Sequence, residues 1–336
     1  MRQKRIKIRE KISLAHGNGG KLMHELIERL RLKFSNKILD ELGDAAELPI
    51  KKSHLSFSTD SYVVKPLFFS GGDIGKLAVC GTVNDVAMKG AKPLFISLSF
   101  ILEEGLEFSI LEEIADSIKR ASDKAKVLVV TGDIKVVERN SVDKVFINTA
   151  GIGIIESKNA PCGCKVRKGD AIVINGGIAE HGMAILSARE NFGFSSKIRS
   201  DCTNLNFIVE RCLSASKNIS LMRDVTRGGL ATVLGEISLS SKVVIELEEE
   251  KIPIKPEVKK MCDILGFDPL YVANEGKFIC FVKAKDALKV KRAIGAGAKI
   301  IGRVTRDKKE KVYLKTKIGS TRLLPLLESD QLPRIC

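Results

Sequence analysis

The apolar positions of the chain switch between helical spacing and the short runs typical of buried strands. Helical spacing from Phe108 to Ala125 predicts a surface helix, and apolar runs at 127–131 and 145–155 predict two strands after it. Further strands are expected at 55–60, 94–100, 171–175, 243–247, 278–282 and 299–304. Further helices are expected at 22–34, 77–88, 180–191, 222–237, 256–265 and 287–294. Because helices and strands alternate in both halves, the sequence predicts an α/β fold.

The length of 336 residues is large for one hydrophobic core, so two domains of ordinary size are the default expectation. We place a first domain at 1–155, a second at 156–322, and a mobile C-terminal tail at 323–336. Each boundary follows the last predicted element of the preceding unit. The tail therefore carries the final residue, Cys336.

Composition narrows the class of protein. Hydrophobic residues make up 44% and charged residues 29% of the chain, which is typical of a soluble globular protein. No apolar run approaches the length of a membrane span, and the basic N-terminus lacks the apolar stretch of a secretory signal. The sequence therefore predicts a cytoplasmic protein without a membrane partner, and its eight cysteines are expected to be mostly buried thiols.

The formal net charge of +15 makes nucleic-acid binding an alternative function. The excess of Lys and Arg is concentrated at 2–11 and 306–317. Aromatic residues make up only 5% of the chain and tryptophan is absent, so a stacking surface for single strands is poorly supplied. Solubility explains the charge more simply, and nucleic-acid binding stays the non-enzyme alternative.

The segment 77–88 is apolar on nearly every side, which predicts a buried helix. Asn84 and Asp85 lie in its middle, where an ionised carboxyl is costly to bury unless it is paired or bound to a cation. One interpretation is a hydrogen-bonded pair that only stabilises the fold. The other is a metal or ligand site, which we favour because no basic residue is adjacent.

Several acids lie near the ends of predicted elements in the first half of the chain: Asp44, Asp60, Asp85 and Asp133. Any one of them is explained equally well as a helix cap or turn residue. Magnesium, however, takes carboxylate, water and phosphate oxygens as ligands. Four acids in one α/β unit therefore favour a magnesium site.

Glycines precede two of the predicted helices. Gly19 and Gly20 come before the helix at 22–34, and Gly228 follows Asp224 at the start of another helix. Backbone N–H groups at such a position can approach an anion at the positive end of a helix. The alternative is that these glycines only make turns.

The chain ends in Pro333-Arg334-Ile335-Cys336. Termini fray, so a terminal cysteine by itself usually has no role. A role depends on exposure and thiolate character, which the neighbouring Arg334 would favour by lowering the pKa of the thiol. An extended tail of about ten residues reaches roughly 35 Å, far enough to travel between two sites.

Seven motifs occur in the order seen in the HypE family of hydrogenase maturation proteins, which this sequence resembles over nearly its whole length. The motifs occupy residues 16–20, 58–60, 81–88, 132–137, 180–184, 223–230 and 273–276. Their Asp and Gly residues are also found in the wider superfamily of aminoimidazole ribonucleotide synthetase, selenophosphate synthetase and thiamine-monophosphate kinase. The terminal Pro-Arg-Ile-Cys narrows the resemblance to HypE.

The resemblance implies a two-domain, PurM-like α/β (α+β) fold, with a mixed-sheet first domain that forms a homodimer and an α/β sandwich as the second. It implies an ATP-dependent carbamoyl dehydratase that converts an S-carboxamide on Cys336 to a thiocyanate, with Mg²⁺ as the second cofactor. In the family, HypF places the carboxamide, and a HypC–HypD complex receives the cyanide for the iron of nickel–iron hydrogenase. The alternative is a superfamily relative acting as a synthetase or kinase on a free small substrate.

The resemblance also implies residue roles. The residues that match the superfamily's metal-binding acids are Asp44, Asp60, Asp85 and Asp224. The residues at nucleotide-site positions are Asn84 and Asp133, together with Gly19, Gly20 and Gly228. Lys135 and Glu275 match the pair expected to move the proton, Cys336 bears the substrate, and Arg334 is expected to hold it. The superfamily often has two acids where this chain has Gly43-Asp44.

Overall fold

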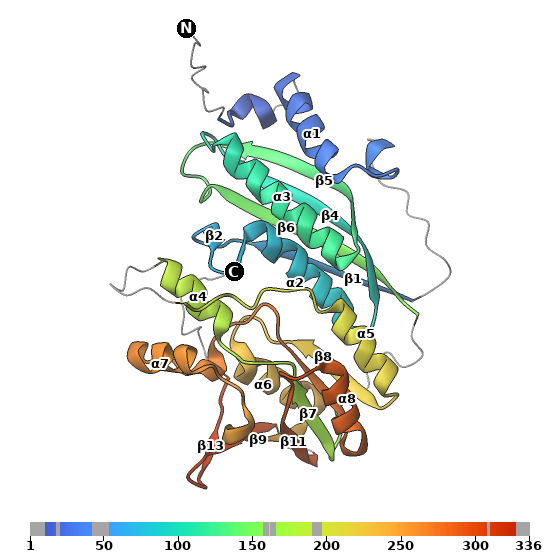
Figure 1. Cartoon of the computed structure of the whole chain (residues 1–336), viewed down its shortest axis with the longest axis vertical. Coiled ribbons are helices and arrows are strands. Elements are labelled where there is room, and N and C mark those ends of the chain that lie inside the picture. The colour runs from blue at the N-terminus through green and yellow to red at the C-terminus, as the bar shows by residue number, and fades with distance from the viewer. Residues whose placement is uncertain are drawn as a thin grey trace.

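The structure, a computed structural model, describes residues 11–17, 21–41, 54–156, 161, 166–189, 197–307 and 310–326. Figure 1 shows two groups of elements, each built around a large sheet. The blue and green elements of the first group occupy the upper half of the view, and the second group lies below them. No helix of the described chain is long and apolar enough to cross a membrane.

The first sheet has four strands in the order β1-β6-β4-β5. Their bounds are β1 (His54–Tyr62), β4 (Lys92–Glu103), β5 (Leu128–Val137) and β6 (Val145–Ile155). Strand β6 pairs antiparallel with β1 and β4, whereas β4 and β5 are parallel. The sheet is therefore mixed, as the sequence analysis expected. A short hairpin of β2 (Phe68–Phe69) and β3 (Gly72–Asp73) leads into the next helix.

Helix α2 (Ile74–Met88) packs directly on the first sheet, and α3 (Phe108–Ala125) packs on α2. Two glycines of β6 permit the close approach of α2. A Cβ at Gly151 would lie 2.7 Å from Thr82 Cγ2, and one at Gly153 would lie 2.6 Å from Val86 Cγ1. Helix α1 (Lys21–Phe34) and the 3-10 turns η1 (Leu14–Gly17) and η2 (Leu39–Glu41) complete this group.

The second sheet has seven strands in the order β13-β12-β9-β11-β7-β10-β8. Their bounds are β7 (Asp170–Ile174), β8 (Ile219–Asp224), β9 (Val243–Glu248), β10 (Phe278–Lys283), β11 (Lys299–Asp307), β12 (Lys311–Lys315) and β13 (Thr321–Leu323). All pairs are antiparallel except β12 with β9.

Helices cover both faces of this second sheet. The five helices are α4 (Glu180–Arg189), α5 (Asn206–Ala215), α6 (Gly229–Ser241), α7 (Pro256–Leu265) and α8 (Ala287–Ile294). Along the central strand β7, Ile172 and Ile174 face the core shared with α6, whereas Ala171 and Val173 face the core shared with α5 and α8. Because side chains alternate between faces of a strand, every residue of β7 is buried. Three further 3-10 turns are η3 (Glu249–Lys251), η4 (Pro269–Tyr271) and η5 (Ala284–Asp286).

The structure confirms most of the predicted elements and corrects some of them. Helices α3, α7 and α8 and strand β6 have the predicted bounds. The strand predicted at 127–131 is too short, because β5 continues to Val137. Gly132 is required inside the strand, since a Cβ there would lie 2.4 Å from the carbonyl oxygen of Leu98. The helix predicted at 222–237 is wrong at its start, because residues 222–224 belong to β8 and α6 begins at Gly229. Helix α5 and strands β12 and β13 were not predicted.

One face of the first sheet is apolar and carries no helix among the described residues. On β1, Leu55 is 49% exposed and Phe57 is 67% exposed. They stand opposite Ile154 and Ile152 of β6, so the four side chains share one face. The face opposite to them is the one on which α2 packs.

Candidate active site

Helix α2 carries Asn84 and Asp85 to the junction between the two groups of elements. It contacts β1 and β6 of the first sheet and also α5 and β8 of the second group. Asn84 is 1% exposed, and its amide nitrogen donates to the carbonyl oxygens of Thr203 (3.0 Å) and Glu275 (3.3 Å). Its amide oxygen accepts from the N–H of Leu205 at 2.8 Å. Asn84 therefore fixes α2 against two loops of the second group.

Three predicted metal-binding acids come together at this junction. Asp85 lies on α2, Asp60 on β1, and Asp224 ends β8. Burial raises the pKa of Asp224 to about 7, and the charge of Asp85 and a hydrogen bond with it add to the effect. Burial also raises the pKa of Asp60, with Asp85 again contributing. Crowded, partly buried carboxyls of this kind are electrostatically suited to a bound cation.

Nearby groups offset this negative charge only in part. Ser58 Oγ donates to Asp85 Oδ2 at 2.7 Å. Arg223 Nε lies 3.9 Å from Asp224 Oδ1, but the same guanidinium also pairs with Glu236. Arg227 lowers the pKa of Asp60 slightly against the effect of burial. Within the described residues, no three His, Cys, Asp or Glu side chains form a ready-made metal cage.

Glu275 is a buried acid in the loop that precedes β10. It is 5% exposed, and burial raises its pKa well above the usual value. The charges of Asp201, Asp224 and Asp60 raise it further. Glu275 therefore lies within electrostatic range of the acids at the junction, and its surroundings disfavour the ionised form.

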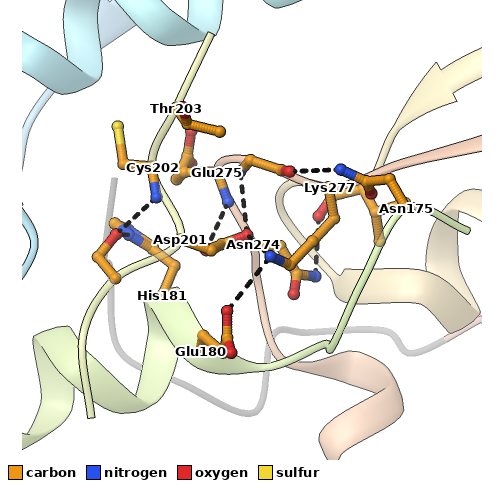
Figure 2. Close-up of polar contacts among 12 residues, drawn as sticks. Asn175, Glu180, His181, Asp201, Cys202, Thr203, Asn274, Glu275 and Lys277 are labelled. Atoms are coloured by element: carbon orange, nitrogen blue, oxygen red, sulfur yellow. Dashed lines mark hydrogen bonds and ion pairs between the residues drawn. The ribbon is translucent and has the colours of Figure 1, made fainter. Parts of the chain in front are cut away.

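A network of ions and amides surrounds the Glu275 loop (Figure 2). Lys277 Nζ lies 3.2 Å from Glu180 Oε2 and 3.5 Å from Asp201 Oδ2. Lys255 Nζ makes a second ion pair with Glu180, at 2.6 Å. Two acids and two cations thus neutralise each other beneath the loop.

Comparison with known proteins identifies the family. The sequence model for the N-terminal domain of AIR synthase related proteins matches residues 42–155, and that for the C-terminal domain matches 167–315. The chain is 43% identical to carbamoyl dehydratase HypE of Rhodobacter capsulatus, over 97% of this chain and 98% of the relative. It is 44% identical to the HypE of Bradyrhizobium diazoefficiens, over 99% of both chains. The chain belongs to the HypE family.

Solved HypE structures have the same fold as this chain. The crystal structure of HypE in complex with ATP is 45% identical, with a TM-score of 0.93 over 96% of this chain and 99% of that chain. HypE from a HypE–HypF complex is 43% identical, with a TM-score of 0.78 over 91% and 99% of the two chains. The predicted family and the predicted two-domain, PurM-like fold are confirmed. Thiamine monophosphate kinase of Aquifex aeolicus, 21% identical with a TM-score of 0.62, shares the fold alone.

Lys135 and Glu275, the predicted proton-transfer pair of this HypE family member, differ in exposure, since Glu275 is buried and Lys135 is not. Lys135 is exposed on β5 and pairs with Asp133 at 3.8 Å. In the part of the chain that the structure describes, no hydrogen bond or ion pair joins Lys135 to Glu275. The roles assigned to Lys135 and to Asp133 stay predictions.

The remaining predicted site residues divide into two groups. Gly228 precedes α6 with φ of 73°, and a Cβ there would lie 2.6 Å from Thr232 Oγ1, so glycine is required whether or not an anion binds. The others lie outside the described residues: Gly19, Gly20, Asp44, Arg334 and Cys336. Asn84 has protein partners for both ends of its amide, and its predicted contact with nucleotide stays a prediction.

The end of the described chain is held by residues of the second group of elements. Leu324 is buried, and its N–H donates to the carbonyl oxygen of Val312 at 2.9 Å. Tyr271 Oη donates to the carbonyl oxygen of Pro325 at 2.7 Å. The side chain of Leu326 occupies the space beside Gly235, where a Cβ would lie 2.7 Å from Leu326 Cδ2. We call Tyr271, Gly235 and residues 324–326 the tail root. Tyr271 ends η4, so this member of the tail root lies four residues before Glu275 in sequence.

Sequence reasoning missed Asp201, Lys277 and Asn175 as members of the site. Asp201 lies in the irregular segment 197–205, where no periodic pattern distinguishes a buried acid from an exposed one. Lys277 directly follows the motif at 273–276, and this position beside Glu275 was the one available signal. Their contacts join segments far apart in the chain, which spacing rules cannot detect.

Proposed function

We propose that this protein is an ATP-dependent carbamoyl dehydratase that converts an S-carboxamide on its own Cys336 to a thiocyanate. The observation that carries the proposal is full-length similarity to HypE proteins named carbamoyl dehydratase, together with the close match to an ATP-bound HypE. The acids gathered at the domain junction support it, because ATP-dependent chemistry needs a place for a cation beside the phosphates.

The junction fits magnesium by the chemistry of its donors. Asp60, Asp85 and Asp224 present carboxyl oxygens, and burial beside like charge raises the pKa values of Asp60 and Asp224. Magnesium needs only one or two carboxylates when waters and phosphates complete its coordination. When bound there, it would neutralise charge on the phosphates of ATP. We infer that these three acids hold it, with Asp44 as a further predicted ligand.

The reaction needs an activated oxygen and the removal of protons from nitrogen. The carboxamide oxygen attacks the γ-phosphate of ATP, ADP departs, and the oxygen then leaves as phosphate while the nitrogen loses its protons. The products are the thiocyanate, ADP and phosphate. We assign proton removal to Glu275, with Lys135 as its predicted partner. Burial raises the pKa of Glu275, so its carboxylate, once ionised, is a stronger base than that of an ordinary glutamate.

The tail root fixes the point from which the C-terminal tail, with the thiol of Cys336 at its end, begins. Ten residues follow Leu326, and a chain of that length reaches about 35 Å when extended. Tyr271, which holds Pro325, lies four residues before Glu275 in sequence, so we infer that the tail begins on the side of the Glu275 loop. We infer that this placement raises the effective concentration of the carboxamide at the active site.

We also propose the partners. The apolar face formed by Leu55, Phe57, Ile152 and Ile154 suits a homodimer, since a second copy would bury the same face. A HypE has been solved with HypF, and we infer that HypF delivers the carboxamide here. Transfer of the cyanide to a HypC–HypD complex and a cytoplasmic location stay predictions.

The mass of the intact protein tests this function. Protein carbamoylated on Cys336 should lose the mass of one water molecule when Mg-ATP is added, with one ATP consumed per thiocyanate formed. Cys336→Ala should show neither change. If Cys336→Ala still turned over ATP with a free small substrate, a synthetase or kinase of the same superfamily would replace our proposal.

A further inference from the structure

We propose that Asp201 is a positioning residue for Glu275, holding the backbone of the proposed base at the geometry that the reaction requires. The proposal rests on the proposed function, because it concerns how Glu275 is presented to the substrate. Asp201 belongs to none of the sequence motifs that identified the family, and it lies in the irregular segment 197–205.

Both carboxylate oxygens of Asp201 accept hydrogen bonds from backbone N–H groups in the Glu275 loop (Figure 2). Asp201 Oδ1 accepts from the N–H of Glu275 at 3.2 Å, and Oδ2 accepts from the N–H of Gly276 at 3.0 Å. Oδ2 also lies 3.5 Å from Lys277 Nζ. One carboxylate therefore binds three successive residues, and its own side chain is only 1% exposed. Hydrogen bonds from backbone N–H groups to a carboxylate are stronger than those between neutral groups.

The close approach of segment 197–205 to the Glu275 loop requires glycine at position 276. A Cβ on Gly276 would lie 2.0 Å from the carbonyl oxygen of Asp201, which no side chain could tolerate. The neighbouring amides fix the rest of the loop. Asn175 Nδ2 donates to the carbonyl oxygen of Gly276 at 2.9 Å, and Asn175 Oδ1 accepts from the N–H of Phe278 at 2.9 Å. Among these contacts, only that of Asp201 binds the N–H of Glu275 itself.

The charge of Asp201 is compensated within the same cluster. A buried carboxylate is costly unless it is paired and hydrogen-bonded, and Lys277 supplies the pairing. Lys277 in turn bridges to Glu180, which Lys255 also neutralises. This arrangement allows Asp201 to be a carboxylate, an acceptor at both oxygens. An asparagine there would offer one acceptor and one NH₂ group, which cannot accept from the second N–H.

The segment that carries Asp201 is attached to the first group of elements on both sides of it. The N–H of Ser200 donates to the carbonyl oxygen of Ser70 at 2.8 Å. On the other side, Asn84 of α2 binds the carbonyl oxygen of Thr203 and the N–H of Leu205. Asn84 is adjacent to Asp85 on the same helix. Asp201 therefore links the position of Glu275 to the helix that carries a proposed magnesium ligand.

The experiment is single-turnover dehydration of the carbamoylated full-length protein with Mg-ATP, followed by intact mass. We expect Asp201→Asn to lower the rate about 10- to 100-fold, because small displacements of a reacting group are costly in rate. We expect the concentration of ATP for half-maximal rate to change less than about twofold, because Asp201 contacts no proposed nucleotide residue. In a Glu275→Gln background, Asp201→Asn should cause no further loss, since a residue that acts only through Glu275 has nothing left to position.

Two further variants make the result decisive. Asp286→Asn removes another buried carboxylate of the second sheet group, one that accepts from Ser216 Oγ and Asn218 Nδ2, and it should leave the rate unchanged. Asp201→Glu keeps the charge but is one methylene too long to accept both N–H groups, so it should also be slow. If wild-type protein loses no water, the proposed function fails first. If wild type reacts, the positioning role is overturned by normal rates in both Asp201 variants, by additive losses with Glu275→Gln, or by failure of both variants to fold.

Discussion

At the residue scale, the pairing of Asp224 with Asp85 has the most direct chemical consequence. The two carboxyls come from different groups of elements, β8 and α2, and burial together with the charge of Asp85 raises the pKa of Asp224. Without a cation, the pair retains a proton that an exposed aspartate would lose. This behaviour links the stability of the protein to pH and to magnesium.

We expect the free energy of unfolding, measured without divalent cations, to fall as pH rises from 3.8 to about 7. The unfolded chain releases the proton of Asp224 near the lower pH, whereas the folded protein keeps it up to the higher one, so deprotonation favours the unfolded state. At about 1.4 kcal/mol per pH unit, the loss is at most about 4.5 kcal/mol. Urea unfolding across this range, in a chelator, measures it.

Two variants test the assignment. Asp224→Asn should flatten the pH dependence, whereas Asp286→Asn should leave the fall in place. Added Mg²⁺ should stabilise the wild type most at the upper end of the range, because bound cations favour the ionised carboxyls. If the free energy of unfolding fell equally steeply with pH in wild type and in Asp224→Asn, the raised pKa of Asp224 would be contradicted.

At the scale of elements, the Glu275 loop and the end of the described chain are held by contacts of irregular segments. Segment 197–205 joins α2 to the Glu275 loop through Asn84 and Asp201. The tail root joins the end of the described chain to η4, just before the same loop. The proposed base is therefore held by connections between loops, and helices and strands supply the frame that keeps these loops in place.

Tyr271→Phe should slow dehydration of the protein's own carboxamide severalfold while leaving ATP binding unchanged. The variant removes the hydrogen bond to Pro325 and loosens the origin of the tail, at a cost in stability of about 1 kcal/mol. Single-turnover rates at saturating ATP measure the effect. Tyr313→Phe, on β12 of the same sheet, is the matched control, because no described hydrogen bond involves its hydroxyl. Equal rates in both variants would show that the root does not guide the thiol.

At the scale of the whole molecule, the domain junction brings together what the chain keeps apart. Asp60, Asp85, Asp224 and Glu275 are separated by up to 215 positions and lie within electrostatic range of one another. The second feature at this scale is the apolar face of the first sheet formed by Leu55, Phe57, Ile152 and Ile154. It leaves apolar side chains of β1 and β6 without a helix among the described residues.

Phe57→Asp should convert the proposed dimer to a monomer. Phe57 is 67% exposed in the single chain, and a charge at the centre of an apolar interface would be buried without a partner. Light scattering after size-exclusion chromatography measures the mass of the particle in solution. Ile264→Asp, at a residue of α7 that is 72% exposed, is the matched control and should leave the mass unchanged. A wild type that runs as a monomer would refute the proposed interface.

The sequence by itself determined the elements whose burial follows a regular period. Helix α3 has its predicted bounds because its apolar residues recur on one face, and β6 has them because an apolar run of strand length is bounded by polar residues. Motifs in a fixed order were sufficient for the family. Strand β8 was missed because residues 222–224 were assigned to the start of the following helix, and β5 was cut short because glycine inside a strand resembles a break.

Only the tertiary structure decided how the site is assembled. The role of Asp201 depends on a contact with Gly276, 75 positions away, and the raised pKa values of Asp224 and Glu275 depend on burial at the junction. The origin of the tail depends on a hydrogen bond between Tyr271 and Pro325. Periodicity reports how one residue relates to its near neighbours along the chain. Hydrogen bonding and desolvation depend on distance in space, which is fixed only when the two sheets pack against a shared helix.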